Sequence, residues 1–339
     1  MPVVIDRDRI PTLWAVRTGG CLMSPGSELA VVKLALVNNM PDAALEDTEL
    51  QFFELLEAAG SEMPIQVELF SLPGLERGDR ARQHLAKSYS STEEILDRRF
   101  DGVIITGTEP RQHDLRNEPY WSSLATLLDW AERNTSSSIL SCLAAHASVL
   151  HGDGIERHPL PDKRFGVFDY QRARNHELLG GVGDLVRFPH SRWNEVRMEE
   201  LTSCGYSVLT QSPEAGVDIF VKQKRASLFV HLQGHPEYGA LTLMKEYRRD
   251  IKRFLRKERE TYPSMPHGYF DERAAKQLAD FRQSAVSNVR EEMMQIFPEA
   301  SIASNLRQTW HATAISVYRN WLQLLAARKS DALAFAAIA

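Results

Sequence analysis

The sequence of 339 residues predicts an α/β fold in which helices sandwich a mostly parallel sheet, with a helical extension at the C-terminus. Two observations indicate this fold. Short, almost continuously apolar runs alternate with stretches of helical periodicity through the first three quarters of the chain. Such runs are typical of strands that a parallel sheet buries on both faces. Beyond residue 266 only helical periodicity remains, which accounts for the extension.

The expected elements of the first half follow one another in strict alternation. Helix ends are indicated by Gly60 and Gly152, and Ser91 begins a helix with an N-cap signature. The elements are a strand at 30–37, a helix at 43–59, a strand at 65–70, a short helix from 91, a strand at 102–106, a helix at 120–134, a strand at 137–141 and a helix at 143–150.

The second half contains shorter strands before the helical extension. Strands are expected at 166–170, 207–211, 217–222 and 227–232, and a long helix at 240–259. Apolar residues then recur at helical spacing in two groups, from Leu278 to Ile296 and from Trp310 to Leu324. They predict two amphipathic helices that pack on the sheet domain or on a second subunit. We therefore expect an N-terminal arm at 1–29, an α/β domain at 30–265 and a helical extension at 266–339.

Composition excludes several classes of protein. The hydrophobic share of 43% and the charged share of 25% are typical of a globular chain with a full core. A net charge of −5 argues against a nucleic-acid partner, and apolar runs long enough for a membrane helix are absent. The N-terminus lacks the apolar stretch of a secretory signal, and three cysteines cannot make a disulfide framework in a chain of this size. We expect a cytoplasmic protein.

Cys142 is the sharpest single candidate for chemistry. It lies between an expected strand and an expected helix, and open α/β sheets place their sites at the carboxyl ends of strands. The start of a helix favours a thiolate. A buried structural thiol explains the same position equally well.

A second candidate is the run Gly-His-Pro-Glu-Tyr at 234–238, directly after an expected strand. His235 and Glu237 complete, with Cys142, the arrangement of an activated nucleophile, in which the imidazole takes the thiol proton and the carboxylate orients the imidazole. A surface turn with a solvated Glu is the ordinary alternative. A metal site is not expected, because His146 and His151 are misaligned on a helix and no Cys/His cluster exists.

Several motifs together resemble the homoserine O-succinyltransferase (homoserine trans-succinylase) family. They lie at 39–41, 46–51, 100–107, 120–121, 141–142, 166–167, 189–192, 234–238, 245–250, 310 and 320–321. The resemblance implies a fold similar to class I glutamine amidotransferases. It also implies transfer of a succinyl group from succinyl-CoA to L-homoserine in methionine biosynthesis. Acyl-CoA and a small amino acid are then the partners, and no cofactor is needed. The amphipathic C-terminal helices favour a homodimer.

The resemblance implies catalytic roles by position. Cys142 would carry the acyl group as a thioester, His235 would be the base, and Glu237 would orient it. Backbone N–H groups would form the oxyanion hole, namely those of Leu143, Gly107 and Thr108.

Five further residues fall where the family contacts its substrates. The resemblance implies that Lys163 and Ser191 would contact substrate, whereas Glu246 and Arg249 would hold the head group of homoserine. Because Glu246 and Arg249 are three apart on an expected helix, they share one face, and an intrahelical ion pair is the alternative. Arg111 falls at the position for acyl selectivity, where a guanidinium can bind the free carboxylate of a succinyl group. A solvated loop arginine is the alternative there.

The chain departs from the family at several positions. Asp42 and Ala43 replace two lysines, Leu143 replaces a Trp, and His146 replaces a Gln. About 30 extra residues lie between 270 and 310, a length typical of a structured insert. Other donors and acceptors therefore stay open, with acetyl transfer or a serine acceptor as alternatives. Two more distant alternatives are a hydrolase like the glutamine amidotransferases and a binding protein without catalysis.

Overall fold

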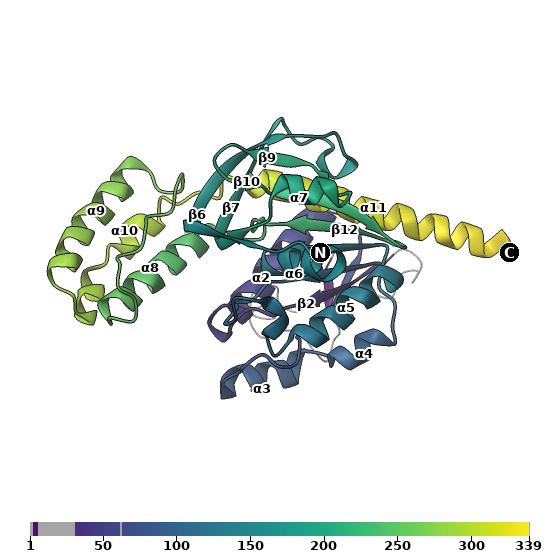
Figure 1. Ribbon diagram of the computed structural model, residues 1–339, viewed down its shortest axis with the longest axis horizontal. Helices are drawn as coiled ribbons and strands as arrows, with labels where there is room; N and C mark the ends of the chain where they lie inside the picture. Colours follow the sequence, from purple (N-terminus) through teal and green to yellow (C-terminus); the bar gives the residue numbers. More distant parts are fainter. Residues whose placement is uncertain (1–2, 6–30, 62, 339) are drawn as a thin grey trace.

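The structure, a computed structural model, describes residues 3–5, 31–61 and 63–338 and is built around a large sheet (Figure 1). Six neighbouring strands are parallel, and β11 runs antiparallel to both of its neighbours. In spatial order the strands are β1 (Val3–Ile5), β3 (Ile65–Phe70), β2 (Val32–Val37), β4 (Gly102–Ile105), β5 (Ser137–Ser141), β12 (Ser227–Leu232), β11 (Ile219–Lys224) and β8 (Ser207–Val208). This confirms the predicted mostly parallel sheet.

Helices cover both faces of this sheet, as its apolar strands require. In β2, Leu34 and Leu36 face one core and Ala35 and Val37 face the other, so alternate side chains of one strand are buried on opposite sides. The first core includes residues of α2 (Asp42–Gly60) and α11 (His311–Ile338), and the second includes residues of α5 (Trp121–Asn134) and α6 (Leu143–Asp153).

Short helices connect the early strands. They are α3 (Asp79–Ser88), α4 (Thr92–Leu96) and the 3-10 turn η3 (Leu115–Asn117). The predicted capping box of Ser91 and Glu94 begins α4. The helix α3 was not predicted, because it buries only Ala81 and Ser88 and so lacks an apolar stripe. The helix α6 passes through Gly152 and ends one residue later, before Gly154 in a left-handed conformation.

A second, smaller sheet lies beside the carboxyl edge of the large one. It contains β10 (Gly216–Val217), β9 (Thr210–Ser212), β6 (His158–Arg172) and β7 (Leu185–Glu195), all antiparallel. The turn η4 (Glu177–Leu179) lies between β6 and β7, and α7 (Met198–Ser203) follows β7. The predicted strands at 207–211 and 217–222 are each divided between the two sheets, because the chain crosses from one sheet to the other within each segment.

The C-terminal helices separate into two groups (Figure 1). One group, α9 (Glu272–Ser287), the turn η5 (Glu291–Ile296) and α10 (Glu299–Ala303), lies with α8 (Thr242–Leu255) away from the end of α11. The other is α11, which returns to the large sheet, where Trp321 Nε1 donates to Ser137 Oγ at 2.9 Å. The prediction of one helix from 278 to 296 is wrong, because the chain leaves the helix at Asn288 and the apolar Ile296 is 63% exposed.

The remaining expectations from composition concern membranes and thiols. Within the described ranges, no helix combines the length and the apolar character needed to span a membrane. Cys142 and Cys204 are free thiols, and Cys21 lies outside the described residues. Of the predicted arm at 1–29, the structure describes β1, which pairs with β3 as the edge strand.

Candidate active site

The central strands β4, β5 and β12 are neighbours, so the loops after them meet at one edge of the sheet. Cys142 directly follows β5 and precedes α6, with φ 52° and ψ −112°. A positive φ is uncommon for a residue with a side chain, and it marks a tight turn from strand to helix. The backbone N–H of Cys142 donates to Leu232 O in β12 at 2.7 Å, which holds this turn against the neighbouring strand.

The loop after β4 packs directly on this turn. A Cβ atom at Gly107 would lie 2.9 Å from the backbone nitrogen of Leu143 and 3.1 Å from its Cβ. Glycine is therefore needed for the loop to approach the first amide of α6. Gly107 thus lies against the amide of Leu143, and Thr108 is the next residue of this loop.

His235 and Glu237 follow β12 and form the second part of the constellation. The imidazole Nδ1 lies 2.8 Å from Glu237 Oε1, and both residues are buried. The backbone N–H of His235 donates to Pro189 O at 2.8 Å, which ties this loop to β7 of the small sheet. Because Cys142 follows the adjacent strand, the fold brings all three predicted catalytic residues together.

Charge controls the protonation of His235. Burial by itself lowers the pKa of an imidazole, but the charges of Glu237 and Cys142, with hydrogen bonds to both side chains, hold the pKa of His235 well above its ordinary value. The His235 ring is therefore placed to hydrogen-bond the Cys142 side chain while Glu237 holds its other nitrogen. The site therefore has the electrostatics of an activated nucleophile.

Asp218, and His190 of the motif at 189–192, had no role assigned from the sequence, and both contact the loop at 234–238. Asp218 accepts a hydrogen bond from the backbone N–H of Gly234 at 2.7 Å, and burial raises the pKa of Asp218 to about 6. The ring of His190 lies only 2.9 Å from where a Cβ of Gly234 would be, so that position requires glycine. The sequence contained the glycine as a signal, but nothing in it marked Asp218.

Four of the predicted substrate residues gather beside the triad. Glu246 Oε2 accepts from Ser191 Oγ and lies 3.4 Å from Lys163 Nζ. Arg249 lies on the same face of α8, 3.9 Å from Glu246. Asp250, which sequence reasoning missed, lies 3.2 Å from both Lys163 and Arg249. The cluster therefore joins α8 to the β6–β7 hairpin.

The charges of this cluster suit an amino acid. Burial would raise the pKa of Glu246, but Lys163, with hydrogen bonds from Ser191 and Tyr238, holds that pKa below its ordinary value. Glu246 is thus an ionised acceptor. Arg249 keeps 45% of its side chain exposed, and its closer partner is Asp250 rather than Glu246. The structure contains the intrahelical Glu246–Arg249 ion pair at 3.9 Å, with Asp250 as the closer partner of Arg249.

Arg111 lies apart from these groups. Its guanidinium pairs with Glu76, and 62% of its side chain is exposed. Its backbone N–H donates to Glu118, which orders the loop that also contains Gly107. Within the described residues, the structure gives no contact between the Arg111 guanidinium and the triad.

His146, a departure from the family, has a structural role. Its Nε2 lies 2.8 Å from Gln233 Oε1, and burial lowers the pKa of His146 to about 3. The neutral ring thus connects α6 to the end of β12. Among the described residues, no group of three or more His, Cys, Asp or Glu side chains could hold a metal ion.

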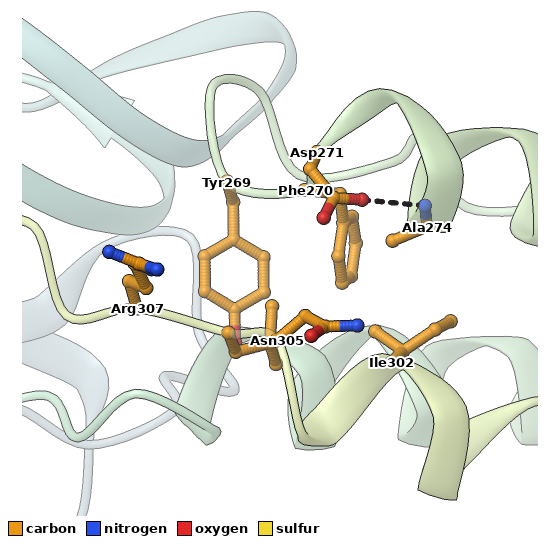
Figure 2. A pocket seen from close by; sticks show the side chains of 8 residues that line it. Tyr269, Phe270, Asp271, Ala274, Ile302, Asn305 and Arg307 are labelled. Atoms are coloured by element: carbon orange, nitrogen blue, oxygen red, sulfur yellow. Dashed lines mark hydrogen bonds between the residues drawn. The ribbon is translucent and has the colours of Figure 1, made fainter.

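A cavity of about 230 Å³ lies in the helical part of the molecule (Figure 2). The carboxylate of Asp271 faces it and caps α9 by accepting the Ala274 N–H at 2.7 Å. The lining described by the structure includes none of the predicted site residues; it is Tyr269, Phe270, Asp271, Ala274, Ile302, Asn305, Leu306 and Arg307.

Known proteins resemble the chain along most of its length. A family model described as homoserine O-succinyltransferase matches residues 23–331. A homoserine O-succinyltransferase of Rhodopseudomonas palustris is 43% identical over 318 residues, which are 93% of this chain and 95% of that protein. One of Methylorubrum extorquens is 41% identical and covers 90% of this chain and 89% of its own length.

Solved structures confirm the predicted fold. A glutamine amido transferase from Methylobacillus flagellatus superimposes with a TM-score of 0.50 at 16% identity, over 88% of this chain and 96% of its own. At that identity the likeness concerns the fold alone. The family model and the two relatives, in contrast, match nearly the whole sequence, and they show that this chain belongs to the homoserine O-succinyltransferase family.

Proposed function

We propose that this protein transfers the succinyl group of succinyl-CoA to the hydroxyl oxygen of L-homoserine, through a thioester on Cys142. The observation that carries the proposal is the position of the Cys142–His235–Glu237 constellation beside an ionised Glu246 and an exposed Arg249. A nucleophile and a binding cluster for a zwitterion thus occupy one edge of the sheet. The product, O-succinyl-L-homoserine, would serve methionine biosynthesis.

The first half-reaction forms the thioester. The Cys142 thiolate attacks the thioester carbonyl of succinyl-CoA, and the N–H groups of Leu143, Gly107 and Thr108 stabilise the oxyanion. The tetrahedral intermediate collapses when the C–S bond to CoA breaks. His235, protonated and held by Glu237, gives its proton to the departing CoA thiolate. CoA leaves, and the acyl group remains on the cysteine.

The second half-reaction consumes the thioester. The ammonium group of homoserine binds the Glu246 carboxylate, and its carboxylate binds the guanidinium of Arg249, whose side chain is 45% exposed. His235, now neutral, takes the proton of the acceptor hydroxyl as the oxygen attacks the thioester carbonyl. The C–S bond to Cys142 breaks, the thiolate is regenerated and the ester is released.

Arg111 is the proposed determinant of the donor. Its guanidinium is exposed and pairs with Glu76, a surface pair of the kind that exchanges readily with another carboxylate. A succinyl group offers that carboxylate, whereas an acetyl group does not. The preference for succinyl-CoA over acetyl-CoA would then arise because the succinyl carboxylate replaces Glu76 as the partner of Arg111.

Steady-state kinetics test the covalent mechanism. Transfer through a thioester predicts parallel lines in reciprocal plots when both substrates are varied. Cys142→Ala is expected to abolish turnover, while circular dichroism shows an unchanged fold. Intersecting lines together with an active Cys142→Ala protein would contradict the proposal.

Separate half-reactions test the acceptor site. Arg249→Ala is expected to raise the KM for homoserine by about tenfold or more, because an ion pair to the substrate carboxylate is lost, while CoA release from the donor continues. Arg248→Ala is the matched control, because this neighbouring arginine pairs with Glu299 instead. If the acceptor half-reaction of Arg249→Ala is as fast as that of the wild-type protein, α8 does not bind homoserine as proposed.

The alternatives predict different substrates for the same thiol. An acetyltransferase would prefer acetyl-CoA, a serine-directed enzyme would prefer serine, and an amidotransferase-like hydrolase would release ammonia from glutamine. A panel of acyl-CoAs with each acceptor, and glutamine alone, separates these outcomes by CoA release and ammonia release.

Assembly and location are also proposals. We expect a cytoplasmic enzyme that works without a metal or a bound cofactor, with acyl-CoA and a small amino acid as its partners. The long α11 extends beyond the body of the molecule (Figure 1) and offers a surface for a second copy, as a homodimer would need. Light scattering of the purified protein tests the dimer.

A further inference from the structure

Tyr238 connects the catalytic histidine to the substrate cluster. Its ring stacks on the imidazole of His235, with 4.3 Å between ring centroids and 16° between the planes. Its hydroxyl donates to Glu246 Oε1 at 2.7 Å. One side chain thus touches both the base of the triad and the carboxylate assigned to the acceptor.

The backbone of Tyr238 is held from two sides. Its N–H donates to His235 O at 3.1 Å, within the catalytic loop. Its carbonyl accepts from Gln308 Nε2 at 2.7 Å and from the buried Trp310 Nε1 at 2.9 Å. Because these donors precede α11, the C-terminal part of the chain fixes the position of the ring.

The Tyr238 hydroxyl keeps its proton and binds one of the two carboxylate oxygens of Glu246. Burial and the charge of Glu246 raise the pKa of Tyr238 well above its ordinary value, so the phenol remains a donor. Glu246 Oε1 binds Tyr238, and Oε2 binds Ser191 and Lys163. Without the hydroxyl, Oε1 loses this partner, and the carboxylate is held through Oε2 alone.

The ring has a separate effect on His235. A cation above the face of an aromatic ring is attracted by the ring's quadrupole. The stacked geometry therefore favours the imidazolium and fixes the plane in which its nitrogens point. This effect needs the ring but not the hydroxyl.

We propose that Tyr238 is a positioning residue with two separable functions: its ring orients His235 for both half-reactions, and its hydroxyl orients Glu246 for the ammonium group of the acceptor. The second function rests on the proposed function of the protein, whereas the first does not.

Two substitutions separate the functions. Tyr238→Phe keeps the ring and removes the hydroxyl, and Tyr238→Leu removes both. Tyr206→Phe is the matched control, because Tyr206 donates to the carboxylate of Asp153 at the far end of α6. The measurements are the pH profile of Cys142 alkylation by iodoacetamide, CoA release in the donor half-reaction, and the KM for homoserine.

We expect Tyr238→Phe to leave alkylation and CoA release within about twofold of wild type and to raise the KM for homoserine by about tenfold, because only the carboxylate loses a partner. Tyr238→Leu is expected, in addition, to slow alkylation near neutral pH by about fivefold and to move the profile to higher pH, because the imidazolium is less favoured. Tyr206→Phe should change none of these.

The opposite results overturn the proposal. An unchanged KM for homoserine in Tyr238→Phe would show that the hydroxyl does not orient Glu246. Equal losses of rate in both half-reactions of this variant would show that the two functions are not separable. An unshifted alkylation profile in Tyr238→Leu removes the role of the ring. If Tyr238→Leu does not fold, Tyr238→Phe alone still tests whether the hydroxyl acts only in the acceptor half-reaction. If the wild-type protein does not use homoserine, the proposed function fails, but the alkylation profiles still test the ring.

Discussion

Replacing Gly107 by alanine adds one methyl group where the loop after β4 meets the first turn of α6. The added carbon would lie 2.9 Å from the Leu143 nitrogen and 3.4 Å from Ser141 O. Gly107 does not have a positive φ, so alanine is not strained by its own backbone. The effect of the substitution therefore comes from the close contact, at the place proposed for the oxyanion.

The expected magnitude follows from this geometry. A contact below 3.0 Å forces the loop and the helix start apart, and such overpacking costs about 1–3 kcal/mol of stability. The same movement displaces the Leu143 amide, and loss of one oxyanion donor costs about 2.7–4 kcal/mol in the barrier, or roughly 10²–10³ in rate. We expect a folded protein with a thioester-forming step slower by that factor.

Two assays on one variant separate the oxyanion hole from the nucleophile. CoA release reports attack on a carbonyl, which needs the oxyanion hole, whereas alkylation of Cys142 by iodoacetamide does not. Gly107→Ala should slow the first and leave the second near wild type. Gly183→Ala is the control, because a Cβ there meets no atom within 4 Å. CoA release near the wild-type rate, or equal losses in both assays, would refute this reasoning.

Three further predictions follow from single contacts. Glu237→Gln removes the charge that raises the pKa of His235, so the imidazolium loses its proton at lower pH. A buried charged hydrogen bond contributes about 1.5–3 kcal/mol, which predicts that alkylation of the thiol at pH 7 is slower by roughly tenfold to a hundredfold. An unchanged pH profile of alkylation would contradict this prediction. Arg111→Ala should raise the KM for succinyl-CoA but not for acetyl-CoA, measured by CoA release, and equal changes for both donors would count against it. Trp321→Phe should lower the free energy of unfolding by about 2 kcal/mol in urea titrations, because a buried ring is shortened and Ser137 loses its donor; no change in the midpoint would show that the site repacks.

The candidate catalytic centre was predictable because its residues follow strands with strong local patterns. The predicted strands at 65–70, 137–141 and 227–232 coincide with β3, β5 and β12. Burial on both faces requires nearly continuous apolar residues, and parallel strands end at a common edge. Cys142 and His235 follow two of these strands, so the sequence predicted that both lie at this edge, and the pairing of β5 with β12 in the fold brings them together.

The surroundings of the centre depended on the tertiary structure. Asp218 lies in a segment without a motif, and Asp250 lies in the motif at 245–250 but had no role assigned to it. Only the packing of separate elements made them partners of Gly234 and Lys163. The small sheet was predicted only in part: a strand was expected at 166–170, within β6, whereas its partner β7 was not expected.

The position of Tyr238 shows the difference most clearly. The sequence placed it next to Glu237 in a recognisable motif, but its contacts with Glu246, Gln308 and Trp310 join three parts of the chain. The spacing of apolar residues along a segment predicts which of its side chains are buried, because it reflects the period of the helix or strand. Contacts between polar groups far apart in sequence depend on how the buried segments pack together, and that information exists only in the folded structure.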